Sequence, residues 1–154
     1  MIIKKEFTFT AEKKPRPLHI YLPDNYDYTN ERYPVMYFFD GHNLFSDEDA
    51  TYGKSWGMEK FMLRNHVQMI ICAVECNHDP NNGRLKEYAP FTFRSSQFGM
   101  IEGRGKITME WYVNELKPAV DASFRTKPDR ENTFIAGSSM GGLMSIYALM
   151  EYNY

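Results

Sequence analysis

The chain of 154 residues lacks several kinds of segment. No apolar run approaches the ~20 residues that a membrane-spanning helix needs, and residues 1–6 lack the apolar core of a secretory signal peptide. Basic residues are scattered, the formal net charge is −2, and no stretch is both basic and aromatic. These absences argue against a nucleic acid or an anionic membrane as partner. We therefore expect a cytoplasmic protein.

Cysteine is also scarce, with only Cys72 and Cys76. Both lie in the run 68–76, which has the pattern of a strand, and four strand residues span ~13 Å. That distance is too long for a disulfide between them. His78 completes a Cys-x-His pair, which is a weak metal signal without further ligands. We expect two buried free thiols, no metal site and no cofactor.

The most informative motif is Gly-Ser-Ser-Met-Gly-Gly at residues 137–142. An apolar run at 133–136 precedes it, and a helical pattern at 143–150 follows. Strand, G-x-S-x-G and helix form a nucleophile elbow, a strained turn that holds a serine hydroxyl clear of the sheet. The pattern predicts Ser139 as a nucleophile and the Met140 amide, at a helix start, as a donor to an oxyanion. The alternative is a glycine-rich turn without chemistry.

Strand patterns dominate the N-terminal part of the chain. Residues 4–10 and 18–22 predict an antiparallel hairpin, with Pro15 and Pro17 in its turn. The continuous apolar run 35–39 is typical of a strand that is buried on both faces.

Helical spacing of apolar residues predicts helices at 56–65 and 109–124, the second bent at Pro118. Residues 77–106 have no clear period, and loops of this length are often functional. Strands that alternate with helices predict an α/β fold with a mostly parallel sheet.

Three groups of residues resemble a known family. They are residues 40–45 (Asp-Gly-His-Asn-Leu-Phe), Arg84 with residues 87–90 (Glu-Tyr-Ala-Pro), and the stretch 114–142 that ends in the elbow. Together they resemble the esterase D and feruloyl-esterase-like branch of the α/β-hydrolase superfamily, over nearly the whole chain. The resemblance implies a mostly parallel sheet with helices on both sides, and serine-esterase chemistry on a small-molecule ester without a cofactor.

The resemblance also implies roles for individual residues. Ser139 matches the nucleophile, the Met140 amide matches one oxyanion donor, and the backbone of Gly41 and His42 matches the second. In α/β-hydrolases the triad acid and histidine follow the serine, but no histidine or aspartate follows Ser139 here. The sequence thus predicts an incomplete domain over residues 1–154 that ends after the elbow helix. Loss of the base predicts very low activity for these residues alone.

Several alternatives stay open at this stage. The His42 side chain could act as a base or line the pocket rim, and Arg84 and Glu87 are expected to form an ion pair that anchors the loop 77–106. The chain could instead be an inactive binding or assembly module, or carry an acyltransferase on the same scaffold. An open sheet edge beside residues 133–136 predicts self-association. The ester substrate is not readable from the sequence.

Overall fold

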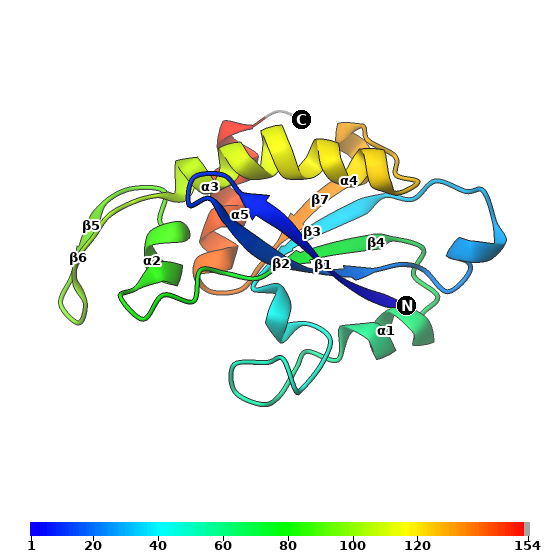
Figure 1. The fold of residues 1–154 in the computed structure, drawn as a ribbon, viewed down its shortest axis with the longest axis horizontal. Coiled ribbons are helices and arrows are strands. Elements are labelled where there is room, and N and C mark those ends of the chain that lie inside the picture. Colours follow the sequence, from blue (N-terminus) through cyan, green and yellow to red (C-terminus); the bar gives the residue numbers. More distant parts are fainter. Residues whose placement is uncertain (153–154) are drawn as a thin grey trace.

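A five-stranded mixed sheet forms the centre of the computed structural model, which describes residues 1–152 (Figure 1). Its strand order is β1-β2-β4-β3-β7. β1 and β2 form an antiparallel hairpin, β2 pairs antiparallel with β4, and β3 pairs parallel with both β4 and β7. The strands are β1 (Ile2–Phe9), β2 (Lys14–Tyr21), β3 (Val35–Phe39), β4 (Ile70–Val74) and β7 (Thr133–Ala136).

Helices cover both faces of this sheet, as expected. In Figure 1 the rod of α3 and α4 lies above the sheet and α1 lies below it. The helices are α1 (Met58–Arg64), α2 (Gly83–Glu87), α3 (Gly105–Trp111), α4 (Lys117–Ser123) and α5 (Met140–Glu151), and a small hairpin consists of β5 (Phe93–Ser95) and β6 (Gly99–Ile101). No helix in the described part of the chain has the length and apolarity needed to cross a bilayer.

Strand β4 shows how the core is divided between the two faces. Its residues Ile70, Cys72 and Val74 belong to the larger apolar cluster, which includes residues of α3, α4 and α5. Ile71 and Ala73 belong to the smaller cluster, together with Met62 of α1 and others. Successive side chains of a strand point to opposite faces, so an unbroken apolar run is what a strand covered on both sides requires. Cys72 and Cys76 are buried free thiols, which confirms that expectation.

The turn of the N-terminal hairpin was placed wrongly from the sequence. The chain turns at residues 10–13, where Lys13 has a φ of 56°, and Pro15 and Pro17 lie within β2 opposite Thr8 and Glu6. Proline is tolerated in a strand at a position where no hydrogen bond to a neighbouring strand requires its missing N–H. The pairing of β2 with β4 begins only at Leu18, so both prolines lie in the stretch that pairs with β1 alone.

The long helix also differs from its predicted bounds. It begins at Gly105 and ends at Ser123, and Phe124 is extended, with φ −131° and ψ 160°. Between α3 and α4 the rod widens into a π-helical segment, η3 (Tyr112–Leu116). Pro118 would clash with the carbonyl of residue 114 in a regular α-helix. The π-helical segment therefore lies just before Pro118, where the sequence predicted a bend in the helix.

The segment 77–106 is more ordered than its sequence pattern indicated, since it contains α2, β5 and β6. A buried ion pair anchors α2 to the sheet. Arg16 Nη1 donates to Glu87 Oε1 at 2.6 Å and Nη2 donates to Oε2 at 3.0 Å, with side-chain exposures of 6% and 5%. Burial alone would lower the pKa of Arg16, but the hydrogen bonds to Glu87 and the negative charges of Glu87 and Glu12 together raise that pKa. The expected pairing of Glu87 with Arg84 is wrong, because Arg84 has a different partner.

Replacing Glu87 with glutamine leaves the buried Arg16 charge without its carboxylate. Breaking a buried pair on one side costs about 3–5 kcal/mol of unfolding free energy. We expect a loss of about 3 kcal/mol, because Glu12, 3.5 Å from Arg16, still offers a negative charge. Urea denaturation of both proteins measures this difference. The matched control is Glu102→Gln. The Glu102 carboxylate pairs with Arg104 and is 66% exposed, so this substitution should change stability by less than about 1 kcal/mol. Equal effects of the two substitutions would contradict the prediction.

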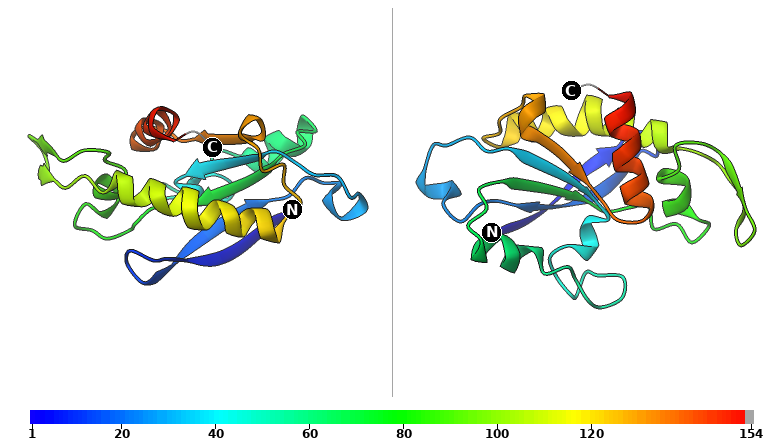
Figure 2. Two further views of the ribbon diagram at one scale, coloured as in Figure 1. Left: turned by 90° about the horizontal axis from the view of Figure 1, so that it is seen from above. Right: turned by 180° about the vertical axis from the view of Figure 1, so that it is seen from behind.

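The edge of the sheet formed by β7 is uncovered in the described residues. β7 pairs with β3 on one side only, and Figure 2 shows it at the edge of the sheet beside α5. Exposed apolar side chains continue from this edge along α5: Phe134 of β7 and Leu143, Ile146, Leu149 and Met150 of α5 are 42–76% exposed. Unpaired backbone groups and an apolar patch both favour association.

We expect the purified chain to associate with a second copy through this edge. Light scattering over a range of concentrations should give a mass above that of the 18.1 kDa monomer. Ile146→Lys should shift the population toward the monomer, whereas Tyr52→Lys, in an exposed loop away from α5, should not. A monodisperse monomer at high concentration would sink the idea.

Candidate active site

The turn between β7 and α5 has an unusual backbone. Ser139 lies between the end of β7 at Ala136 and the start of α5 at Met140, with φ 55° and ψ −120°. A positive φ is rare for a residue with a side chain, and such strain costs on the order of 1–3 kcal/mol. The Met140 amide opens α5, and the first amides of a helix have no partner within the helix. The order of strand, strained turn and helix around Ser139 is the one that the sequence predicted.

Two glycines allow the helix to cross the strand closely. A Cβ on Gly137 would lie 2.6 Å from the carbonyl carbon of Gly141. A Cβ on Gly141 would lie 3.0 Å from the Cβ of Phe39, the last residue of β3. No larger residue fits at Gly137 without a backbone shift. The turn between β7 and α5 is therefore packed directly onto the end of β3.

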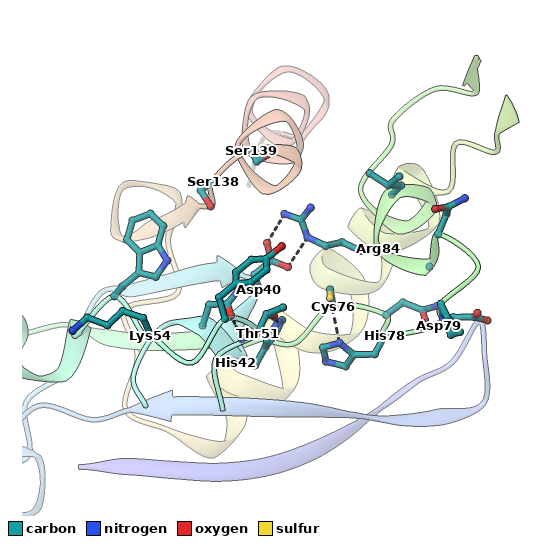
Figure 3. A pocket seen from close by; sticks show the side chains of 18 residues that line it. Asp40, His42, Thr51, Lys54, Cys76, His78, Asp79, Arg84, Ser138 and Ser139 are labelled. Atoms are coloured by element: carbon teal, nitrogen blue, oxygen red, sulfur yellow. Dashed lines mark hydrogen bonds and ion pairs between the residues drawn. The ribbon is translucent and has the colours of Figure 1, made fainter. Parts of the chain in front are cut away.

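A cleft of about 610 Å³ opens beside this turn (Figure 3). It lies where the parallel strands β3, β4 and β7 end, the position at which open α/β sheets usually bind ligands. The residues that line it include Asp40, His42, Trp56, Cys76, His78, Arg84, Ser138 and Ser139. The structure thus brings residues from three separate strand ends into one cleft.

Asp40 joins two of these segments. It has a left-handed backbone (φ 59°, ψ 49°), its carboxylate accepts hydrogen bonds from Arg84 Nε at 2.9 Å and Nη2 at 2.7 Å, and its amide donates to the Tyr88 hydroxyl at 3.1 Å. The hydrogen bond to Asp40 raises the pKa of Arg84. Arg84 thus anchors the loop 77–106, as expected, but through Asp40. The sequence reasoning missed this role, although a polar residue directly after a buried strand was a usable signal.

The loop after β3 is pressed onto β4. A Cβ on Gly41 would lie 2.3 Å from the carbonyl carbon of Ala73 and 2.6 Å from the amide nitrogen of Val74. Gly41 opens the short turn η2 (Gly41–Asn43), and His42 and Asn43 of this turn line the same cleft as Ser139. The turn after β3 is therefore at the same end of the sheet as Ser139. Gly41 is fixed in place by this contact with the strand.

The ring of His42 is buried and lines the cleft. Its Nε2 lies 3.0 Å from Thr51 Oγ1, and the ring packs edge-on against that of His78, with centroids 4.7 Å apart. Burial and the neighbouring His78 lower the pKa of His42, which keeps the ring neutral at pH 7. Figure 3 shows Ser138 and Ser139 on the other side of the Asp40–Arg84 pair. This position favours a role for His42 in the cleft wall over a role as the base for Ser139.

The other histidines are placed as follows. His78 lines the cleft and contacts Glu75, with Nε2 2.9 Å from Oε1. His19 lies in β2 and holds the second oxygen of Glu75 at 2.7 Å. His66 follows α1. None of the contacts found for these rings within residues 1–152 involves Ser139.

Comparison with known proteins gives the family. The family model described as "Putative esterase" matches residues 10–153. The chain is 24% identical to the uncharacterized protein YbbA of Bacillus subtilis over 139 residues, covering 89% of this chain and 52% of YbbA. It is 29% identical to an endo-1,4-beta-xylanase/feruloyl esterase of Xylanibacter ruminicola over 153 residues, covering 90% of this chain and 18% of that protein. The chain therefore spans about half of YbbA and a smaller share of the xylanase/feruloyl esterase.

Solved structures show the same fold. An IroE-like serine hydrolase from Shewanella oneidensis superimposes with a TM-score of 0.74 at 22% identity, covering 97% of this chain and 46% of that one. The enterobactin esterase FES from Shigella flexneri gives a TM-score of 0.69 at 16% identity, covering 99% of this chain and 34% of the other. These likenesses establish the α/β-hydrolase-type fold, and the match over residues 10–153 establishes that the chain belongs to this esterase family.

Proposed function

We propose that this chain carries the nucleophile and the oxyanion-binding amides of a serine carboxylic ester hydrolase. The observation that carries the proposal is the strained backbone of Ser139, which stands at a strand-to-helix turn on the wall of the cleft. Membership of the esterase family supports ester hydrolysis as the reaction. The conformation of Ser139 supports a serine mechanism, because backbone strain of this kind persists where function requires it.

In this mechanism the Ser139 hydroxyl oxygen attacks the ester carbonyl carbon while a general base takes the hydroxyl proton. The carbonyl oxygen becomes an oxyanion, which accepts hydrogen bonds from the Met140 amide and from an amide of the Gly41–His42 turn. Collapse of the intermediate expels the alcohol, which receives the proton, and leaves an acyl-serine. Water then hydrolyses the acyl-serine and releases the acid.

The general base and its acid partner are proposed to lie outside these 154 residues. The order serine, acid, histidine in this fold places both after the nucleophile. The greater length of the relatives supports this placement, since the chain covers 52% of YbbA. His42, the other candidate for the general base, contacts Thr51 and His78 instead.

We propose an aromatic acyl ester as the substrate class. One relative is named as a feruloyl esterase, and the aromatic side chains of Tyr52 and Trp56 line the cleft at 94% and 59% exposure. An acyltransferase would form the same acyl-serine and pass the acyl group to an alcohol in place of water. Product analysis with an added alcohol separates the two, because only a transferase yields the new ester in preference to the acid.

The nucleophile can be tested in the protein expressed from the whole reading frame that contains this chain. Ser139→Ala should abolish labelling by a fluorophosphonate probe and lower p-nitrophenyl acetate hydrolysis by at least ~10³-fold. Ser138→Ala, one residue away in the same cleft, is the matched control and should keep most of both signals. Residues 1–154 alone should be much slower. Labelling at Ser138, or none in the longer protein, would overturn the assignment.

The oxyanion loop is tested by adding a methyl group at Gly41. The Gly41→Ala side chain would meet the β4 backbone at 2.3 Å, so the loop must move away from β4, and its amides with it. Loss of one oxyanion donor costs ~10²–10³-fold in kcat, and we expect a fall in kcat in that range with a smaller change in KM. Gly99→Asn is the control, because Gly99 lies in the β5–β6 hairpin with nothing within 4 Å of a Cβ. An unchanged kcat in a folded Gly41→Ala protein would argue against the loop's role.

A further inference from the structure

The cleft contains a second group of reactive side chains that the proposed reaction does not use. His42, Cys76 and His78 each offer one donor atom, and these atoms all lie within 4.8 Å of one another. His42 comes from the turn after β3, while Cys76 and His78 come from the loop after β4. Figure 3 shows the three below the Asp40–Arg84 pair, with the Cys76 sulfur facing the His78 ring.

The partners of the two imidazoles decide which nitrogens face inward. His78 Nε2 lies 2.9 Å from the Glu75 carboxylate, which leaves Nδ1 toward Cys76 Sγ at 3.8 Å. His42 Nε2 lies 3.0 Å from Thr51 Oγ1, and its Nδ1 is buried without a hydrogen-bond partner within the described residues. A buried nitrogen without a partner loses the free energy of its hydration. Its presence here therefore points to a missing ligand.

The surroundings of this group match the outer shell of metal sites. Metal-binding histidines almost always donate the other ring N–H to a carboxylate or another oxygen, which fixes the tautomer and the ring orientation. Glu75 serves His78 in this way, and His19 holds the second carboxylate oxygen at 2.7 Å. Thr51 is the corresponding oxygen for His42.

We propose that His42 Nδ1, Cys76 Sγ and His78 Nδ1 bind a divalent transition metal of the zinc type. Bond lengths of about 2.0–2.3 Å place the donors of a tetrahedral zinc ion roughly 3.3–3.6 Å apart. The 3.8 Å between Cys76 and His78 is close to that spacing, and the remaining separations close with a small rotation of the side chains. A thiolate with two imidazoles selects zinc, copper or cobalt over magnesium and calcium. The cleft leaves room for water as a fourth ligand.

Binding requires that Cys76 lose its proton. Burial and the nearby carboxylate of Asp40 raise the pKa of this thiol to about 12, so the apo protein holds it as S–H. The metal displaces that proton, forms the metal–sulfur bond and releases one H⁺ to solvent, as at other thiolate sites. The ion then ties the turn after β3 to the loop after β4. Its role is structural, because Ser139 lies beyond the Asp40–Arg84 pair.

The sequence reasoning expected no metal site because it considered Cys72, Cys76 and His78 but not His42. The third donor is 34 positions before Cys76 and joins them only through the parallel pairing of β3 with β4. The inference does not depend on the proposed esterase activity, since all three donors lie within the described residues.

Cobalt(II) titration of the reduced, untagged chain tests the site. We expect a sulfur-to-cobalt charge-transfer band and visible bands of a tetrahedral complex that saturate at one equivalent. Zinc should displace the cobalt and raise the melting temperature, because a ligand that binds only the folded state stabilises it. Cys76→Ser should remove the charge-transfer band, and His78→Ala should weaken cobalt binding strongly. Glu75→Gln should weaken it by ~10–100-fold.

The controls use the residues outside the cluster. Cys72→Ala removes the other cysteine, which is fully buried in β4, and His66→Ala removes an exposed histidine; both should bind cobalt as the unmodified chain does. If Cys76→Ser fails to fold, His78→Ala decides the matter, because this side chain is 55% exposed and its removal leaves the core intact. Absence of a thiolate band in the folded chain, or a band that survives Cys76→Ser, would overturn the proposal.

Discussion

The cleft depends on Asp40, whose backbone, carboxylate and amide each constrain a different part of its wall. Its left-handed backbone turns the chain out of β3, its carboxylate holds both nitrogens of one edge of Arg84, and its amide is bound by Tyr88. A non-glycine residue adopts such a backbone only where its surroundings compensate for the strain. The same residue thereby fixes the direction of the turn after β3 and the position of the loop 77–106. Both are walls of the cleft.

Two charged pairs hold the loop 77–106, and they differ in their environment. Arg16 and Glu87 are almost completely buried, while Arg84 is one-third exposed beside the buried Asp40. Removing charges from water is costly, so such pairs add little net stability compared with apolar residues of the same size. Their value lies in geometry, since a bidentate guanidinium–carboxylate contact fixes both distance and direction. The short helix α2 has few apolar anchors, and directional contacts keep it in place.

The three parallel strands differ in how completely their neighbours cover them. β3 and β4 are covered on both faces and paired on both edges. By contrast, β7 has a free edge in the described residues, and α5 exposes Leu143, Ile146, Leu149 and Met150. The helical hydrophobic pattern of α5 is nearly continuous around the helix, which is typical of a helix with neighbours on several sides. The turn at Ser139 therefore lies at the boundary between the packed and the uncovered parts of the described chain.

The sequence by itself determined the features that depend on neighbouring residues. The strands β3, β4 and β7, the hairpin, and the placement of Ser139 between a strand and a helix follow from apolar periodicity and from glycine spacing within about ten residues. Only the tertiary structure decided which distant groups meet. Arg84 pairs with Asp40 and Glu87 with Arg16 because the order β2-β4-β3 brings those strand ends to α2, and His42 reaches Cys76 and His78 across the same strands. Local patterns carry no record of strand order, because strand order is set by how whole faces pack against one another.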